Sequence, residues 1–151
     1  DSCRIEKAFR HFGHDISPED HVLEAGLGFA VKVNKPKGRF GPFIGRDAVL
    51  RKKESGLTKR LLQFQLEDPE PLLFHNEPVL RDGQIVGYLT SGAYGHYLGS
   101  AVGLGYVPTQ PSLTVEELLA SRYAIEIAGK VFPARASLAP LYDPKAERMR
   151  S

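Results

Sequence analysis

The sequence contains a single cysteine, Cys3, among its 151 residues. One cysteine excludes an intramolecular disulfide framework and any metal site built from several cysteines, and it suits a reducing compartment. Because no catalytic partner for Cys3 can be recognised, we expect a buried structural thiol. No apolar run approaches the roughly 20 residues that cross a bilayer, and the first residues resemble neither a signal peptide nor a transit peptide. These absences predict a cytoplasmic protein without a membrane partner.

An excess of charge of one sign is also missing. The sequence has 20 Lys and Arg residues against 18 Asp and Glu residues, for a formal net charge of +2. This balance argues against a protein dedicated to phosphate backbones, so nucleic acid is not an expected partner. The sequence does not begin with methionine, and we expect it to be a piece of a longer polypeptide. Its length is enough to bury about 70% of the extended surface, so a core can form without disulfides or stabilising metal sites.

The common nucleotide-binding and metal-binding motifs are not found either. The glycine-rich runs at residues 41–45 and 91–99 have neither the GxGxxG nor the phosphate-loop spacing, and the second lies between two predicted strands with no helix after it. We interpret both as turns and as positions of close sheet packing. His11, His14 and His21 match no defined zinc spacing, so we predict exposed loop histidines and no metal site.

Regular patterns begin after residue 57. Residues 59–66 alternate with a period of two, which predicts a strand with Leu62, Phe64 and Leu66 on one face. An Asp-Gly pair at 82–83 predicts a tight hairpin, and a final hairpin is expected around Gly129. In residues 101–107, large apolar side chains alternate with Ala and Gly, which would let another backbone or a ligand approach closely. Residues 114–120 predict a short helix that begins with a capping box. About six short strands with regular turns favour a small closed or sandwiched antiparallel sheet.

The part before residue 57 is less regular. Residues 2–9 alternate loosely and are predicted to begin as a strand. Residues 27–33 are apolar and bounded by turn residues, which predicts a buried strand. Residues 47–55 have helical composition, and Gly56 stands where a glycine would end that helix.

Two carboxylates, Glu6 and Glu24, stand next to apolar residues. Because Asp and Glu are rarely buried without a partner, an inward carboxylate indicates a ligand contact or an ion pair. Arg4, Arg10 and Lys32 could supply the ion pair. Both interpretations stay open on chemistry alone.

Seven short motifs occur in an order that resembles one protein family. They lie at residues 4–13, 23–28, 32–36, 43–46, 87–92, 103–107 and 141–144. The sequence resembles the carboxyl end of sarcosine and dimethylglycine dehydrogenases, whose folate region is similar to the glycine cleavage T protein, an aminomethyltransferase. In that family a flavin domain oxidises an N-methyl amine, and a tetrahydrofolate domain captures the one-carbon unit.

The resemblance implies a mostly β fold with some α, in the α+β class. Residues 1–56 would form the end of the aminomethyltransferase-like folate-binding domain, and residues 57–151 a six-stranded antiparallel β barrel. FAD would belong to an upstream domain of the parent chain, because no dinucleotide-binding motif is present here. No catalytic residue is expected in this piece. Its expected partners are the folate cofactor and the upstream domains of the same parent chain.

The resemblance also implies folate-binding residues. Glu6 occupies the place of the family's carboxylate that holds the pterin, and a carboxylate can accept two hydrogen bonds from the pterin amino group and ring N–H. Phe12 would give the pteridine an apolar wall. Glu24 is a second candidate, although Val22 stands where the family has proline. Candidates for holding the anionic folate tail are Arg46, Arg81 and Arg135.

Three functions stay open. The first is the carboxyl-terminal piece of an FAD-dependent N-methyl amine dehydrogenase of the dimethylglycine or sarcosine type, which forms part of the tetrahydrofolate site. The motif style at Lys7-Ala8 and at residues 142–144 favours it. The second is the carboxyl-terminal half of an aminomethyltransferase, which has no flavin. The third is a non-catalytic β-barrel interaction module with a vestigial pocket.

Overall fold

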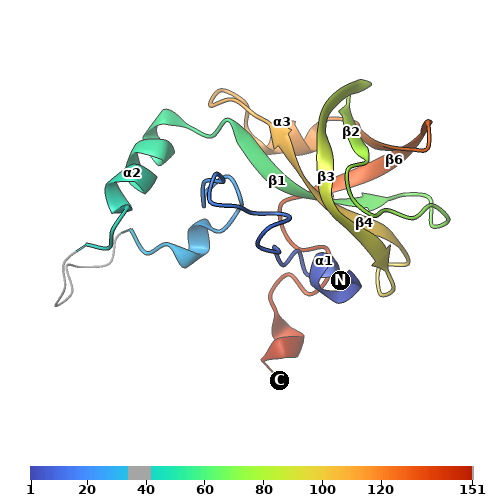
Figure 1. Cartoon of the computed structure of the whole chain (residues 1–151), viewed down its shortest axis with the longest axis horizontal. Helices are drawn as coiled ribbons and strands as arrows, with labels where there is room; N and C mark the ends of the chain where they lie inside the picture. The colour runs from blue at the N-terminus through green and yellow to red at the C-terminus, as the bar shows by residue number, and fades with distance from the viewer. Residues whose placement is uncertain (34–41, 151) are drawn as a thin grey trace.

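Six antiparallel strands close into a barrel in the second part of the chain (Figure 1). The computed structural model describes residues 1–33 and 42–150, so the motif at 32–36 and the glycine-rich run at 41–45 lie partly outside the described residues. Around the barrel the strand order is β1-β4-β3-β2-β5-β6. The strands are β1 (Lys59–Leu66), β2 (Pro78–Arg81), β3 (Gln84–Gly95), β4 (Ser100–Pro108), β5 (Tyr123–Ile127) and β6 (Lys130–Ser137). The predicted six-stranded antiparallel barrel and mostly β fold are confirmed.

The barrel core follows from the alternation in β1. Leu62, Phe64 and Leu66 point to one face and are almost completely buried, as the period of two predicts. The predicted hairpin is also present, because Asp82 and Gly83 both adopt positive φ angles of 53° and 84°. Positive φ at both turn residues gives the twist that joins β2 to β3 tightly.

Small residues let β3 and β4 pack closely, as predicted. A Cβ atom on Gly103 would lie 2.9 Å from the Leu89 side chain and 3.0 Å from the Ser91 carbonyl. A Cβ on Gly105 would lie 2.9 Å from the Tyr88 carbonyl. The glycine-rich run at 91–99 differs from the prediction, since its first part belongs to β3 and is not a connection between strands.

The helices are short. Of the two predicted ones, α2 (Arg46–Ser55) ends at Gly56, which has a φ of 86°, and α3 (Val115–Ala120) begins with the capping box. Figure 1 shows α2 standing apart from the barrel, beyond the segment that leads into β1. No helix in residues 1–33 or 42–150 is long and apolar enough to cross a membrane.

Two strand predictions in the amino-terminal part were wrong. Ser2–Glu6 forms a helix, α1, that buries the consecutive residues Ile5 and Glu6, a pattern that the alternating faces of a strand do not allow. Ile5 packs in one cluster with Ala8 and with Leu61 of the barrel. Residues 27–33 contain only the single 3₁₀ turn η1 (Gly28–Ala30), with Phe29 83% exposed. A buried strand needs a neighbouring strand edge, and the closed barrel offers none. A second 3₁₀ turn, η2 (Glu147–Met149), lies near the end of the chain.

Candidate functional site

Glu6 ends α1 and turns its carboxylate toward the barrel. It is 5% exposed, and its Oε1 accepts hydrogen bonds from the backbone N–H groups of Tyr97 (2.8 Å) and Leu98 (3.1 Å) in the turn between β3 and β4. A Cβ on Gly95 would lie 3.1 Å from this oxygen, so glycine gives the carboxylate its place. Among the described residues, Glu6 has no ion-pair partner, and its second oxygen receives no hydrogen bond. One oxygen of the carboxylate is therefore held in place, while the other oxygen can still accept hydrogen bonds.

Gln63 joins α1 to the barrel and to the carboxyl-terminal segment. Its buried amide donates to the carbonyls of Ile5 (2.6 Å) and Glu6 (3.0 Å). Its carbonyl accepts from the N–H of Leu141 at 2.8 Å. The sequence analysis did not single out Gln63. The sequence offered no local signal for it, because Gln65 in the same strand is also a glutamine between two apolar residues.

The carboxyl-terminal motif folds back against the same helix. Lys7 Nζ lies 2.6 Å from Asp143 Oδ2, and the hydrogen bond from Lys7 holds the pKa of Asp143 below its ordinary value. The rings of Tyr142 and Tyr97 lie 4.1 Å apart between centroids, with Arg148 near both rings. The two motifs that favour the dehydrogenase branch are thus in direct contact.

A buried carboxylate that the sequence analysis missed holds the loop after α1. Asp15 is 1% exposed and pairs with Arg4 at 2.8 Å. It also accepts from the N–H of His11 at 2.9 Å and from the hydroxyl of Thr90 on β3. Arg4 in turn donates to Ser91 at 2.9 Å. This network fixes the loop that carries the predicted aromatic wall, and no local pattern distinguishes Asp15 from an exposed loop aspartate.

Glu24 is engaged in an ion pair. Its Oε1 lies 2.9 Å from Lys52 of α2 and accepts hydrogen bonds from the N–H (3.1 Å) and hydroxyl (3.0 Å) of Thr58. Burial alone raises the pKa of Glu24, but the hydrogen bonds from Lys52 and Thr58 outweigh it, so the pKa lies below its ordinary value. The ion-pair interpretation therefore holds for Glu24, with a partner other than Arg4, Arg10 or Lys32.

Phe12, the histidines and Cys3 lie at the surface. Phe12 is 67% exposed beside its bridge to Ile16. His11 and His14 are exposed as predicted, while His21 is half-buried. Cys3 is exposed, so the predicted buried thiol was wrong: α1 turns Ile5 and Glu6 toward the barrel, and Cys3 lies on another side of the helix. In the part of the chain that the structure describes, no group of three or more His, Cys, Asp or Glu residues could hold a metal ion.

The structure does not bring the predicted folate residues into direct contact. No hydrogen bond or ion pair between described residues joins any two of Glu6, Phe12 and Glu24. The predicted tail-binding arginines are also spread over three elements. Arg46 begins α2, Arg81 on β2 donates to the Pro108 carbonyl, and Arg135 on β6 donates to Gln65.

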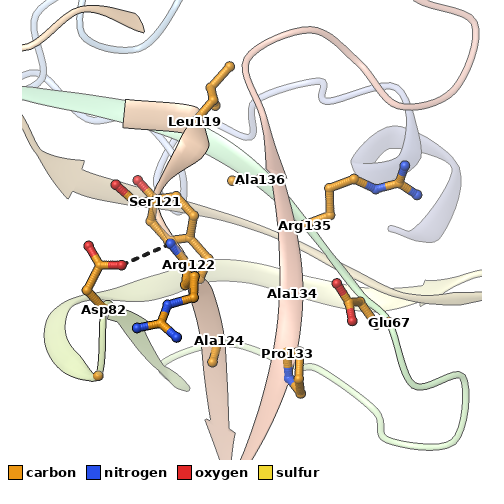
Figure 2. Close-up of a pocket in the computed structure, with 12 residues that line it drawn as sticks. Glu67, Asp82, Leu119, Ser121, Arg122, Ala124, Pro133, Ala134, Arg135 and Ala136 are labelled. Carbon is orange, nitrogen blue, oxygen red and sulfur yellow. Dashed lines mark hydrogen bonds between the residues drawn. The ribbon is translucent and has the colours of Figure 1, made fainter. Parts of the chain in front are cut away.

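Two of the cavities have volumes of about 700 Å³, which is enough for an organic ligand. One, of about 690 Å³, lies against β5 and β6 and contains acidic and basic groups together. Figure 2 shows Asp82 accepting from the backbone N–H of Arg122, at 3.1 Å, with Glu67 and Arg135 on the other side. The second, of about 710 Å³, lies between the amino-terminal and carboxyl-terminal segments. Neither is lined by Glu6, Phe12 or Glu24.

The fold and these contacts define a class: a closed six-stranded barrel with an amino-terminal segment docked on it through buried carboxylates and one glutamine. The family model described as "Glycine cleavage T-protein C-terminal barrel domain" matches residues 59–143. This match covers more than half of the chain. The chain belongs to the glycine cleavage T-protein C-terminal barrel domain family.

Three proteins of known name or structure are similar to this chain. It is 42% identical to 4-methylaminobutanoate oxidase (formaldehyde-forming) of Paenarthrobacter nicotinovorans, over 99% of this chain and 17% of that protein. It is 34% identical to the mitochondrial sarcosine dehydrogenase of Homo sapiens, over 99% of this chain and 16% of that protein. The crystal structure of aminomethyltransferase T of the glycine cleavage system from Bartonella henselae superposes with a TM-score of 0.76 at 23% identity, over 95% of this chain and 38% of that one. The chain spans about a sixth of the length of the first two relatives.

Proposed function

We propose that this chain is the carboxyl-terminal part of an FAD-dependent N-methyl amine dehydrogenase and forms one side of a tetrahydrofolate site that captures the one-carbon unit. Residues 1–56 end the folate-binding domain in this proposal, and residues 57–151 are its barrel domain. The two relatives named for the oxidation of methylated amines support this class of reaction. The parent chain would supply the flavin, the catalytic residues and the selection of the amine.

Glu6 is the observation that carries the proposal. Its carboxylate is held by two backbone N–H groups at one oxygen, and the other oxygen receives no hydrogen bond from the described residues. A pterin presents an amino group and a ring N–H side by side, which are donors that such a carboxylate accepts well. Phe12, exposed on the loop held by Asp15, is available to pack on an aromatic ligand. Glu24 is held by Lys52 and Thr58, so in this proposal it positions the segment near the site.

FAD does not fit the residues of this chain. A dinucleotide is held by a glycine-rich turn that links a parallel strand to a helix, whereas every pairing between the described strands is antiparallel. We therefore assign FAD to an upstream domain of the parent. A cytoplasmic location stays a prediction of the sequence.

The aminomethyltransferase is the second candidate, and the family's description favours it. Lys7 and Asp143 argue for the dehydrogenase. Each residue belongs to a motif that resembles the dehydrogenases more than the aminomethyltransferases. The two residues form a short ion pair, so the two motifs act as one structural unit.

Replacing Glu6 by glutamine in the full-length polypeptide tests the folate assignment. Glutamine keeps an oxygen for the N–H groups of Tyr97 and Leu98 but removes the charge, so tetrahydrofolate should bind more weakly by about 1.5–3 kcal/mol, as expected for hydrogen bonds to a charged group. The exposed Glu19→Gln provides a matched control with the same change of charge. Calorimetric titration measures both affinities. Equal affinities for the Glu6→Gln variant and the wild type would show that Glu6 does not hold the pterin.

The size of the native polypeptide separates the candidate functions. An antibody against this chain should detect a band several times heavier than 16.7 kDa if the parent is a flavin dehydrogenase, and the purified protein should be yellow. A colourless protein only two to three times heavier would favour the aminomethyltransferase. A band at the mass of this chain would contradict both enzymes and favour the interaction module.

A further inference from the structure

Arg10 lies in the cavity of about 710 Å³ between the amino-terminal and carboxyl-terminal segments. Its Nε donates to the carbonyl of Ala25 at 2.9 Å, and its Nη1 donates to the carbonyl of Ala8 at 2.6 Å. Its Nη2 packs so closely on Gly26 that a Cβ there would lie 2.6 Å from it. These contacts hold the guanidinium in one orientation at the cavity wall.

The charge of Arg10 has no counter-charge beside it. Among the described residues, 1–33 and 42–150, no carboxylate lies within 4.0 Å of the Arg10 guanidinium. The nearby Asp15 forms its ion pair with Arg4. Burial lowers the pKa of Arg10, and the charge of the more distant Asp15 offsets this only in part. Carbonyl oxygens orient this guanidinium but do not neutralise it, so it keeps donor capacity for an anion.

The rest of the cavity combines apolar walls with further positive charge. Phe9, Leu27, Phe29 and Leu138 supply the apolar surface. The lining has four basic side chains and a single carboxylate, Asp143, which is already paired with Lys7. The chain as a whole is nearly neutral, so this concentration of positive charge is a local property of the cavity.

From these observations we infer that the cavity is a binding site for a carboxylate carried on a flat apolar body. The carboxylate pairs with Arg10, and the apolar body packs against Phe9, Leu27, Phe29 and Leu138. An arginine fork recognises a carboxylate in a directed way, and an apolar pocket with a few fixed polar groups is the usual form of a small-molecule site. The site is separate from Glu6, which does not line this cavity.

A nuclear magnetic resonance titration of the ¹⁵N-labelled 151-residue chain tests the inference. The probe is 2-naphthoate, and its neutral analogue 2-naphthamide has the same shape without the charge. Naphthoate should shift the Arg10 Nε–H signal in a saturable way, and naphthamide should bind at least about tenfold more weakly, because it lacks the charge-assisted hydrogen bonds. An unmoved Arg10 signal, or equal binding of the amide, would overturn the inference.

Two variants and one control complete the test. Arg10→Gln should weaken naphthoate binding at least about tenfold, while Arg51→Gln on the exposed side of α2 removes the same charge and should change nothing. Since Arg10 also supports two backbone carbonyls, Phe29→Ala provides a variant at an 83% exposed position that leaves the fold intact. It removes an apolar wall and should weaken naphthoate several-fold. Unchanged affinity in both variants would contradict the site.

The same titration identifies the source of the carboxylate. 4-Aminobenzoyl-glutamate carries its carboxylates on an aromatic amide, as the tail of a folate does. If it shifts the Arg10 signal and binds more tightly than naphthoate, the site holds a folate tail. If it binds more weakly, the site belongs to a separate small aromatic acid.

Discussion

The amino-terminal segment and the barrel are held together by different forces. The described part of residues 1–56 buries only three apolar side chains, Ile5, Ala8 and Ala25, while Phe12, Phe29 and Ile44 are largely exposed. The barrel has a continuous apolar core that includes all six strands. The segment instead contributes buried carboxylates that find their partners on the barrel or on neighbouring segments. The barrel is thus a domain with its own core, and the segment is held by polar contacts and by one small apolar cluster around Ile5 and Ala8.

This difference predicts that replacing phenylalanine by alanine changes the free energy of unfolding much more in the barrel than in the segment. Phe64→Ala opens a cavity in the barrel core and should lower the free energy of unfolding by about 3–5 kcal/mol. Phe29→Ala removes a ring that is 83% exposed and should change it by no more than about 0.5 kcal/mol. Urea denaturation followed by circular dichroism measures both values. Similar losses in the two proteins would mean that the segment has a core of its own.

Replacing Gln63 by leucine should detach α1 from the barrel. The N–H of Leu141 would lose its hydrogen-bond partner, at a cost of about 1–3 kcal/mol if it stays out of water. The carbonyls of Ile5 and Glu6 would each lose one donor but keep the backbone N–H groups of Ala8 and Tyr142. Hydrogen exchange should become faster in residues 2–9 while the β1 amides keep their protection. The exposed Gln84→Leu is the matched control. Equal acceleration in α1 and β1 would show that the segment and the barrel unfold as one unit.

The Glu24 ion pair should make the position of α2 depend on pH. The folded-state pKa of Glu24 lies below its ordinary value, so the pair stabilises the protein at pH values above the ordinary glutamate pKa. This contribution is lost as the pH falls through the folded-state pKa. Glu24→Gln should remove about 1.5–3 kcal/mol at pH 7 and flatten the dependence below about pH 5. Exposed Glu54→Gln should keep the wild-type profile, and urea titrations between about pH 7 and pH 3 compare them.

The proposed Arg10 site is a further difference between the amino-terminal segment and the barrel. Among the described residues, the segment leaves the Arg10 guanidinium without an ion-pair partner and keeps the rings of Phe12 and Phe29 in contact with water. A ligand or a neighbouring part of the parent chain can use such groups. In the proposed function, the segment and its contact with the barrel supply the binding groups, while the barrel core supplies stability.

The regular elements were predictable because their signals are local. The alternation at residues 59–66, the Asp-Gly turn at 82–83 and the capping box of α3 each involve neighbours within a few residues. Their geometry is decided by backbone and side-chain preferences of those residues, so the sequence showed them directly. Glycine at position 56 ended α2 for the same reason.

The site was only partly predictable because its partners are distant in the chain. Glu6 was identified from its motif, but its contact with the turn at Tyr97 and Leu98 spans more than 90 residues. Asp15 and Gln63 were missed because a polar residue in a loop or strand carries no local sign that it will be buried. Residues 27–33 were apolar enough for a strand, yet a strand also needs an open edge, and the closed barrel has none.

The sequence by itself determined the barrel strands, their turns, two helix boundaries and the family to which the chain belongs. Only the tertiary structure decided that Ser2–Glu6 is a helix, that Glu24 pairs with Lys52, and that Arg10 lines a cavity without forming an ion pair with a described residue. The physical reason is range. Periodicity and turn chemistry act between near neighbours, whereas burial, ion pairing and desolvation depend on which distant segments meet once the barrel has closed.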